Sequence, residues 1–499
     1  MVRLYLIFLA SLGCTVLLGN NIQITDLRVD YETGNPGYGL LTFDLSWENS
    51  WRTSAAPANW DAAWVFAKYR VGPNGEWQHI LLTAGAPAPT GAVVEVMDGT
   101  GAMVYAAADQ ATHAHYRQTQ LRWNLAANGV DYIDELEFRV FGIEMVYVPE
   151  GAYWLGSTEK GKETNKFYAA GDKKKRPPYL VASADEIAVG TNDGELYYED
   201  KDGDGADFAG PIPADFPKGF GAFYAMKYEL SQKQYVDFFN TLTPAQKAVH
   251  DITDATGKGT DEDHSRNCIS YDHRIGGDAT TSAPHVPVGF VSIADMMAYF
   301  DWSGLRPMSE MEFEKLCRGP ELPVKEEYAW GTAKIAKWKF EPANVNGSGE
   351  ILINLNKLKP TDGYAAYEKT TKATRSGFGP LRSGIFSASL GLGSTRVWSG
   401  AGYYGNMELS GNQWEGVVSV THADGRSFTN RHGNGFLPES GYADVPTWPQ
   451  TEHGIGARGG RSNSDEDYLR VADRSYMTLT EYDQHSRNFY MQFRGVRGL

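Results

Sequence analysis

Three aspartates at alternating positions form the most regular acidic motif in the chain. Asp200, Asp202 and Asp204 occupy the first, third and fifth positions of a loop whose sixth residue is Gly205. Carboxylates with this spacing, followed by a glycine, match a calcium-binding loop of the EF-hand type. The twelfth position is Pro211 instead of glutamate. The motif therefore predicts either a weak calcium site or a solvated acidic turn.

The C-terminal stretch 475–492 combines tyrosines with small polar residues. Tyrosine offers a large rigid contact area, and serine, asparagine and aspartate offer adaptable hydrogen bonds, as in antibody paratopes. We expect this stretch to bind a surface ligand, either a protein or a glycan; the alternative interpretation is a tolerant surface loop. The residues expected to contact the ligand are Tyr476, Tyr482, His485, Asn488 and Tyr490.

Other chemistry is sparse in the sequence. His264, Cys268 and His273 lie close enough in sequence to approach a transition metal, but their segment is rich in aspartate. The sequence contains no glycine-rich phosphate loop, catalytic-triad elbow or zinc-protease motif. After the N-terminal apolar segment only Cys268 and Cys317 remain, which is too few for a disulfide scaffold. Whether these two cysteines pair is left open by the sequence.

The charge and the N-terminus limit the classes of partner. A formal net charge of −16 disfavours binding to nucleic acid. Residues 1–19 combine Arg3, an apolar run and the small residue Gly19, which is typical of a secretory signal peptide. No later stretch is long and apolar enough to cross a bilayer. We therefore expect a secreted, cell-surface or periplasmic protein.

Residues 20–143 show the pattern of an antiparallel β-sandwich. Phe43, Leu45 and Trp47 alternate with polar residues, as in a strand with one buried face. Asn74-Gly75 separates two apolar runs and predicts a hairpin turn. The tryptophans of this region either fill the core or form an exposed platform for sugar stacking. They are Trp47, Trp51, Trp60, Trp64, Trp77 and Trp123.

Residues 144–499 mix short strands with helices and predict an α+β region, so the whole chain is expected to be α+β. Helix starts are marked by a hydroxyl residue at the N-cap, in most cases with glutamine or glutamate three positions later. These N-caps are Ser231, Thr243, Ser292 and Ser309.

Five blocks in the second region resemble the formylglycine-generating (sulfatase-modifying) enzyme family, which has a C-type-lectin-like fold. They follow the order of that family over most of residues 144–499. The blocks are Met145–Ser157, Met226–Tyr235, Pro287–Gly331, Met407–Glu415 and Arg458–Arg497. Five ordered blocks are evidence for the fold and leave the activity open.

The resemblance also implies which residues carry the family's metals. Its enzymes oxidise a cysteine with copper and oxygen, using two reactive cysteines whose positions match Glu466 and Val471. Neither residue supplies a thiolate, so no copper is expected. The family's calcium ligands match the side chains of Glu408 and Glu415 and the carbonyls of Gly411 and Gln413. Asn344 and Val345 resemble the start of a second calcium site.

From these observations we expect an exported, non-catalytic relative of the family that acts as a calcium-stabilised binding or structural module at the cell surface. The alternative is an oxidoreductase of the same superfamily with an unrecognised metal site. Self-assembly through the N-terminal region is a third possibility.

Overall fold

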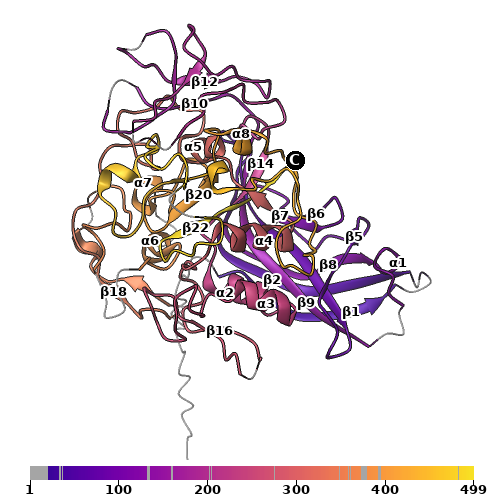
Figure 1. Cartoon of the computed structure of the whole chain (residues 1–499). Helices are drawn as coiled ribbons and strands as arrows, with labels where there is room; N and C mark the ends of the chain where they lie inside the picture. The colour runs from indigo at the N-terminus through magenta and orange to yellow at the C-terminus, as the bar shows by residue number, and fades with distance from the viewer. Residues whose placement is uncertain are drawn as a thin grey trace, which may run out of the picture.

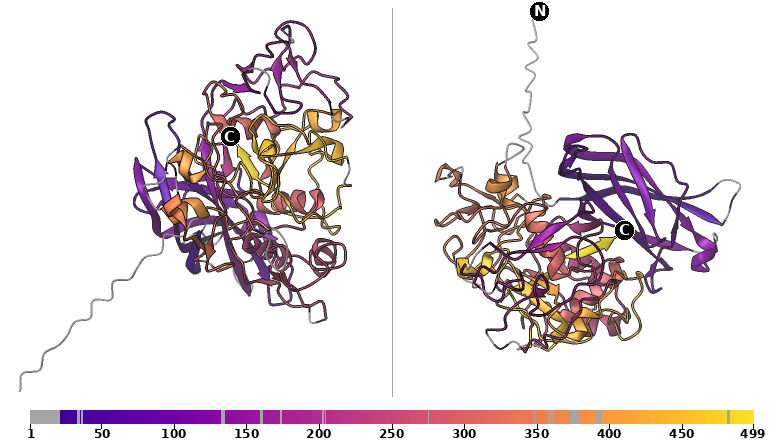
Figure 2. Two further views of the ribbon diagram at one scale, coloured as in Figure 1. Left: turned by 90° about the vertical axis from the view of Figure 1, so that its left-hand side faces the viewer. Right: turned by 90° about the horizontal axis from the view of Figure 1, so that it is seen from above.

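The N-terminal region forms a β-sandwich in the computed structural model, which describes residues 21–499 except 33–34, 36, 132–134, 159–160, 173, 202, 204, 275, 348, 358, 360, 373–378, 391–394 and 481–482. One sheet has the order β1-β2-β8-β5, and the other layer contains β6, β7, β3 and β9. Both layers are visible in Figures 1 and 2. The predicted sandwich is confirmed. Its strands are β1 (Gln23–Tyr31), β2 (Tyr38–Arg52), β3 (Asp61–Val71), β4 (Gln78–His79), β5 (Leu82–Thr83), β6 (Ala92–Met97), β7 (Gly101–Ala106), β8 (Gln110–Asn124) and β9 (Leu136–Val148), with the short helix α1 (Leu125–Asn128).

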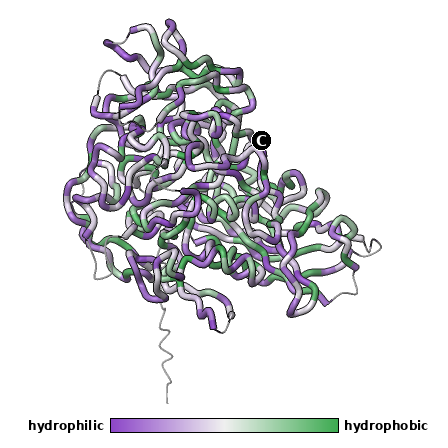
Figure 3. Tube along the Cα trace, viewed as in Figure 1, coloured by the Kyte–Doolittle hydropathy of each residue, from purple (hydrophilic) through white to green (hydrophobic). Residues whose placement is uncertain are grey.

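Alternating side chains explain the sandwich core. Phe43, Leu45 and Trp47 of β2 are buried together with Leu121 and Trp123 of β8. Figure 3 shows the corresponding interleaving of hydrophobic and hydrophilic residues along these strands. The predicted hairpin also forms, because β3 and β4 pair antiparallel on either side of Asn74-Gly75.

Strand β9 joins the two regions into one structure. It pairs with β3 over its length and with β14 of the second region at its C-terminal end. The result is a single sheet with the order β17-β23-β14-β9-β3-β7-β6. The boundary expected between residues 143 and 144 therefore falls inside a strand, and no linker separates the two regions there.

A buried charge cluster fixes the junction of the two regions. The Lys227 ammonium lies 3.0 Å from the Asp61 carboxylate and 3.3 Å from that of Glu144. Asp61 also accepts a hydrogen bond from the indole N–H of Trp47 at 2.8 Å. All of these groups are buried. Because a buried charge is tolerated only with partners, this cluster constrains how β3 and β9 meet the second region.

The second region is a loop-rich α+β structure in which the predicted caps form. Ser231, Thr243, Ser292 and Ser309 each accept a hydrogen bond from the backbone three residues on, and that residue's side chain binds back to the cap. The helices that follow are α2 (Gln232–Phe239), α3 (Pro244–His250), α4 (Ile293–Ser303) and α5 (Glu310–Arg318).

The remaining elements are short. The later helices and helical turns are α6 (Ile385–Leu390), α7 (Arg396–Ser399), α8 (Ala423–Arg426), η1 (Leu355–Lys357), η3 (Glu452–Gly454) and η4 (Glu466–Leu469). The strands are β10 (Tyr153–Leu155), β11 (Tyr168–Ala169), β12 (Tyr179–Val181), β13 (Leu196–Tyr197), β14 (Phe223–Met226), β15 (Ile269–Ser270), β16 (Thr280–Thr281), β17 (Arg306–Pro307), β18 (Pro342–Ala343), β19 (Ile351–Leu352), β20 (Trp414–Val418), β21 (Ile455–Arg458), β22 (Met491–Phe493) and β23 (Gly495–Gly498). Within the described residues, no helix is long and apolar enough to span a membrane.

Candidate functional site

Three buried glutamates lie on or beside one turn in the interior of the second region. Glu408 and Glu415 flank the turn that enters β20, and Glu229 precedes the N-cap of α2; all three are buried. Arg494 lies between β22 and β23 and donates to Glu415 at 2.6 Å. Glu229 accepts hydrogen bonds from the Asn412 amide at 2.5 Å and from the backbone N–H of residue 413 at 3.0 Å. Glu229, from a distant part of the chain, thus lies against the turn that carries Glu408 and Glu415.

The three carboxylates outnumber the positive charge available to them. Burial raises the pKa of Glu229 well above its ordinary value, and the negative charges of Glu408 and Glu415 raise it further. Burial also raises the pKa of Glu415, and that of Glu408 to about 7. The Oε2 atoms of Glu408 and Glu415 are buried without a hydrogen-bond partner. Orphaned buried carboxylate oxygens are the kind of atoms that a cation would satisfy.

The turn between the two glutamates has an unusual backbone conformation. Glu408, Gly411 and Asn412 all have positive φ angles of 58°, 89° and 68°. A left-handed backbone is unusual for glutamate, whereas glycine and asparagine adopt it more readily, and it turns successive peptide groups sharply. The four residues predicted as calcium ligands, Glu408, Gly411, Gln413 and Glu415, therefore lie on one compact turn.

The donor set fits a hard cation in part. Two carboxylate oxygens are orphaned, and backbone carbonyls of the turn would have to complete an oxygen shell. Among the described residues, no three His, Cys, Asp or Glu side chains are grouped as a metal site. Sequence reasoning gave no role to Glu229 or Arg494, although both stand inside the matched blocks.

The other predicted calcium residues lie on separate loops. Asn344 has a positive φ and donates from its amide to the carbonyl of Gly349 at 3.2 Å, and Val345 is exposed. Asp200 caps its own loop by accepting from the backbone N–H groups of Gly203, Gly205 and Ala206 at 2.9–3.0 Å. Asp202 and Asp204 fall outside the described residues, so the EF-hand-like motif stays a prediction.

The C-terminal stretch divides into two places. His485 and Asn488 line a cavity of about 640 Å³ together with Tyr442 and Asp254. Arg487 lines the same cavity and donates hydrogen bonds to the Asp295 carboxylate at 2.8 and 3.1 Å.

The tyrosines of the same stretch lie elsewhere. Tyr476 packs edge-on against Trp414 with ring centroids 5.0 Å apart, and Arg461 lies 3.8 Å above the ring of Tyr490. The structure therefore places His485 and Asn488 on one cavity, whereas Tyr476 and Tyr490 each make aromatic contacts elsewhere. Tyr482 falls outside the described residues.

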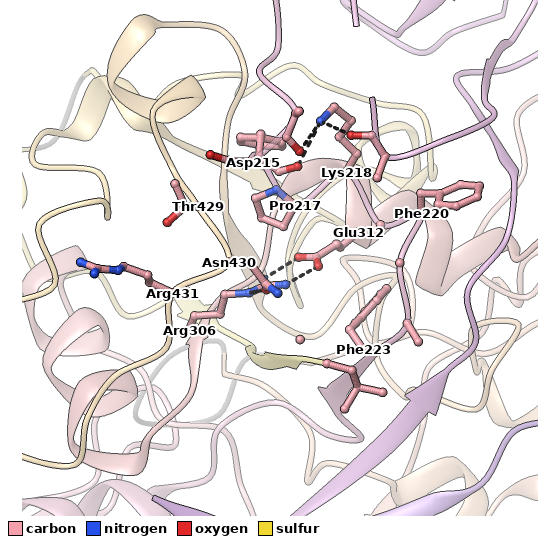
Figure 4. A pocket seen from close by; sticks show the side chains of 18 residues that line it. Asp215, Pro217, Lys218, Phe220, Phe223, Arg306, Glu312, Thr429, Asn430 and Arg431 are labelled. Atoms are coloured by element: carbon pink, nitrogen blue, oxygen red, sulfur yellow. Dashed lines mark hydrogen bonds and ion pairs between the residues drawn. The ribbon is translucent and has the colours of Figure 1, made fainter. Parts of the chain in front are cut away.

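A cavity of about 410 Å³ near the C-terminus is lined by charged side chains that bind other groups of the protein (Figure 4). Arg306 makes a two-point ion pair with Glu312 at 2.6 and 2.9 Å. Lys218 donates to backbone carbonyls, including those of Ala184 and Ala214 at 3.2 and 3.1 Å. Charges satisfied in this way stabilise the wall and offer little to a ligand.

The positions matched to the reactive cysteines have different surroundings. Glu466 lies beside the Lys337 and Lys369 ammonium groups, at 3.0 and 3.2 Å. Although burial opposes it, these lysines lower the pKa of Glu466. Val471 is buried in an apolar cluster that also contains Cys317.

Neither cysteine of the described part supplies a reactive thiolate. Cys268 and Cys317 are both free and buried, so they do not pair. Burial raises the pKa of each thiol, which favours the protonated and unreactive form.

The buried carboxylate turn, the short capped helices and the long ordered loops define a protein of mixed α+β architecture built around an irregular core. A comparison with family models matches residues 142–486 to the sulfatase-modifying factor enzyme 1-like domain. The chain therefore belongs to this family, as the sequence blocks predicted. No curated protein matches the chain.

Copper is the metal that the family implies for oxidation. The matched positions offer a carboxylate already paired with two lysines, at Glu466, and an aliphatic side chain, at Val471. Cuprous copper prefers soft sulfur ligands, so this pair does not fit it.

Proposed function

We propose that this protein is an exported, non-catalytic member of the family that uses the fold as a calcium-stabilised binding module at the cell surface. One observation carries the proposal: Glu466 and Val471 stand where the family resemblance places reactive cysteines. A lysine-paired carboxylate and a buried aliphatic group provide neither a nucleophile nor a soft metal ligand. The fold would then present a surface for binding but would have no centre for oxidation.

The activity is tested directly by offering the purified protein a cysteine-containing peptide with copper, a reductant and oxygen. We expect no aldehyde product by mass spectrometry and no oxygen uptake above that of the peptide and copper alone. Conversion of the peptide cysteine to an aldehyde would refute the proposal and favour the alternative, an oxidoreductase with a different metal site.

The calcium part of this proposal is supported by two buried oxygens without a hydrogen-bond partner, one each from Glu408 and Glu415. A divalent cation on these oxygens would relieve the repulsion among Glu229, Glu408 and Glu415. We expect about one calcium ion per chain by equilibrium dialysis and elemental analysis, lost in Glu415→Gln. Glu439→Gln, an exposed glutamate, is the matched control. Calcium content that is equal in both variants would remove this site from the proposal.

The cavity lined by His485 and Asn488 is the proposed binding surface. It combines an imidazole, an amide, the Tyr442 phenol and the Asp254 carboxylate. Arg487, which also lines it, is fixed by its hydrogen bond to Asp295. Rigid aromatic groups beside adaptable polar groups suit recognition of a protein or a glycan. Screening on an array of cell-surface glycans and extracellular proteins should give a ligand whose binding falls in His485→Ala and Asn488→Ala. His453→Ala, another exposed histidine, should bind as the unmodified protein does.

A further inference from the structure

A second cavity opens where the two regions meet, away from the cavity of His485 and Asn488. It has a volume of about 350 Å³, at the low end of the range for small-molecule sites. The N-terminal region contributes Asn49 and Trp51 from β2, and the second region contributes Arg396 of α7 with Tyr403 and Tyr404. Because both regions form its wall, the cavity exists only in the joined structure.

Two residues of the wall carry a donor atom that is buried and has no hydrogen-bond partner. They are Asn49, through its amide nitrogen, and Arg396, through Nε. Buried donors are almost always satisfied in folded proteins. The phenols of Tyr403 and Tyr404 also line the cavity, and Tyr404 is only 4 % exposed. The wall therefore offers donors to an acceptor-rich ligand.

The charge of the wall favours an anionic ligand. No Asp or Glu is among the described residues that line the cavity, although the chain as a whole carries a net charge of −16. Lys227 and Arg396 both line it. Asp61 and Glu144 neutralise Lys227 from behind. Arg396 instead donates to two backbone carbonyls, those of Cys317 at 2.6 Å and Ala329 at 2.8 Å. The acid that acts most strongly on its charge, Glu327, lies outside the cavity wall and forms its ion pair with Arg318.

The aromatic groups of the wall add a flat surface on which a sugar ring can pack. Trp51 has the Lys227 ammonium 4.9 Å from its ring centroid, and no aromatic ring of the described residues stacks on it. The Arg396 guanidinium lies 5.3 Å from the centroid of Tyr403, so a positive charge and a phenol are adjacent. Flat aromatic surfaces beside polar donors are typical of sites for sugar rings, because the C–H faces pack on the aromatic ring and the hydroxyls bind the donors.

We propose that this interdomain cavity binds a sugar ring that carries a carboxylate. The ring packs on Trp51, and the carboxylate accepts hydrogen bonds from the hydroxyls of Tyr403 and Tyr404 beside the charge of Arg396. The amide of Asn49 binds a ring hydroxyl. This site is independent of the surface proposed above for the C-terminal stretch.

The test is a calorimetric titration of the full-length secreted protein with sodium glucuronate and sodium galacturonate. Glucose and galactose are the neutral probes, and sodium benzoate is the carboxylate without a sugar ring. We expect the uronates to bind at least about tenfold more tightly than the neutral sugars, because hydrogen bonds to a charged group are stronger. The uronates should also bind more tightly than benzoate, and their affinity should fall as salt is added.

Conservative variants locate the site. Tyr404→Phe and Tyr403→Phe keep the rings and remove only the hydroxyls, so each should weaken uronate binding by about tenfold. Tyr105→Phe, which removes a hydroxyl from the outer surface of the N-terminal region, should bind as the unmodified protein does.

Three results would overturn the proposal. They are no uronate binding, equal affinity for neutral sugars or benzoate, and unchanged affinity in a Tyr403→Phe/Tyr404→Phe double variant that melts normally. His485→Ala should keep uronate binding, so failure of this site is distinguishable from failure of the surface of the C-terminal stretch.

Discussion

Glu408 is the residue at which proton binding and the proposed calcium binding would be linked. Its buried carboxylate has one oxygen hydrogen-bonded to the backbone N–H of Gly384 at 2.8 Å and one oxygen without a partner. In the proposed calcium site, a cation and a proton would therefore compete for the same oxygen. The folded protein holds a proton there at a pH at which the unfolded chain releases it, because burial raises the pKa of Glu408 to about 7.

This competition predicts how stability changes with pH when calcium is removed. The contribution of Glu408 is fully present below its unfolded pKa of about 4.5 and is lost as the pH rises to about 7. In chelator, we expect the unfolding free energy to fall by up to about 3 kcal/mol over this window. Calcium should protect most at the alkaline end, and Glu408→Gln should flatten the curve. The measurement is urea unfolding at several pH values; a curve that is unchanged in Glu408→Gln would contradict the assignment.

The residues of this site differ in how far the sequence could predict them. Glu408 and Glu415 stand within one short block, so their meeting on one turn is a local consequence of spacing. Glu229 and Arg494 reach the same turn from 184 and 79 residues away, as their bonds to residues 413 and 415 show. No local pattern encodes such contacts; they arise from how β14, β22 and β23 pack together.

At the scale of elements, helix α5 carries the densest buried charge of the second region. Glu310 forms ion pairs with Arg458 at 3.0 Å and Arg474 at 2.7 Å. One turn later, Glu314 pairs with Arg458 at 2.8 Å and with Arg318 at 3.1 Å. All of these groups are buried, so each charge depends on its partner. The start of α5 at Ser309 was predictable from its capping box, whereas its ion pairs with β21 and the loop after η4 required the tertiary structure.

Removing one charge from α5 should therefore be costly. We expect Glu310→Gln to lower the unfolding free energy by about 3–5 kcal/mol, because two buried arginines lose a shared counter-charge. Urea unfolding monitored by circular dichroism measures the change. Glu321→Gln, an exposed glutamate just after the same helix, should change it by less than about 0.5 kcal/mol. Equal effects of the two substitutions would contradict the role of the network.

At the scale of the whole molecule, the two regions form one folding unit. Strand β9 belongs to both, and the largest apolar cluster contains Trp64 and Phe66 of β3 together with Phe238 and Trp302 of the second region. The sequence held a signal for this continuity: from Leu136 to Val148, apolar residues recur between single polar residues and a glycine, without a Pro or a clear turn motif. The change of composition near residue 144 indicated a domain boundary, but composition does not report which strands pair.

A shared sheet and a shared core predict that neither region folds alone. Deleting residues 20–143 would remove β3, expose the edge of β9 that remains, and open the cluster around Phe238 and Trp302 to water. We expect a fragment of residues 144–499 to aggregate, and the protein with both regions to unfold in one calorimetric transition whose calorimetric and van't Hoff enthalpies agree. Asp61→Asn, which weakens the buried contact with Lys227 at the junction, should lower the temperature of that single transition without splitting it. Two separate transitions, or a soluble fragment with native-like circular dichroism, would show that the regions are independent and that the interdomain cavity is not a fixed part of the structure.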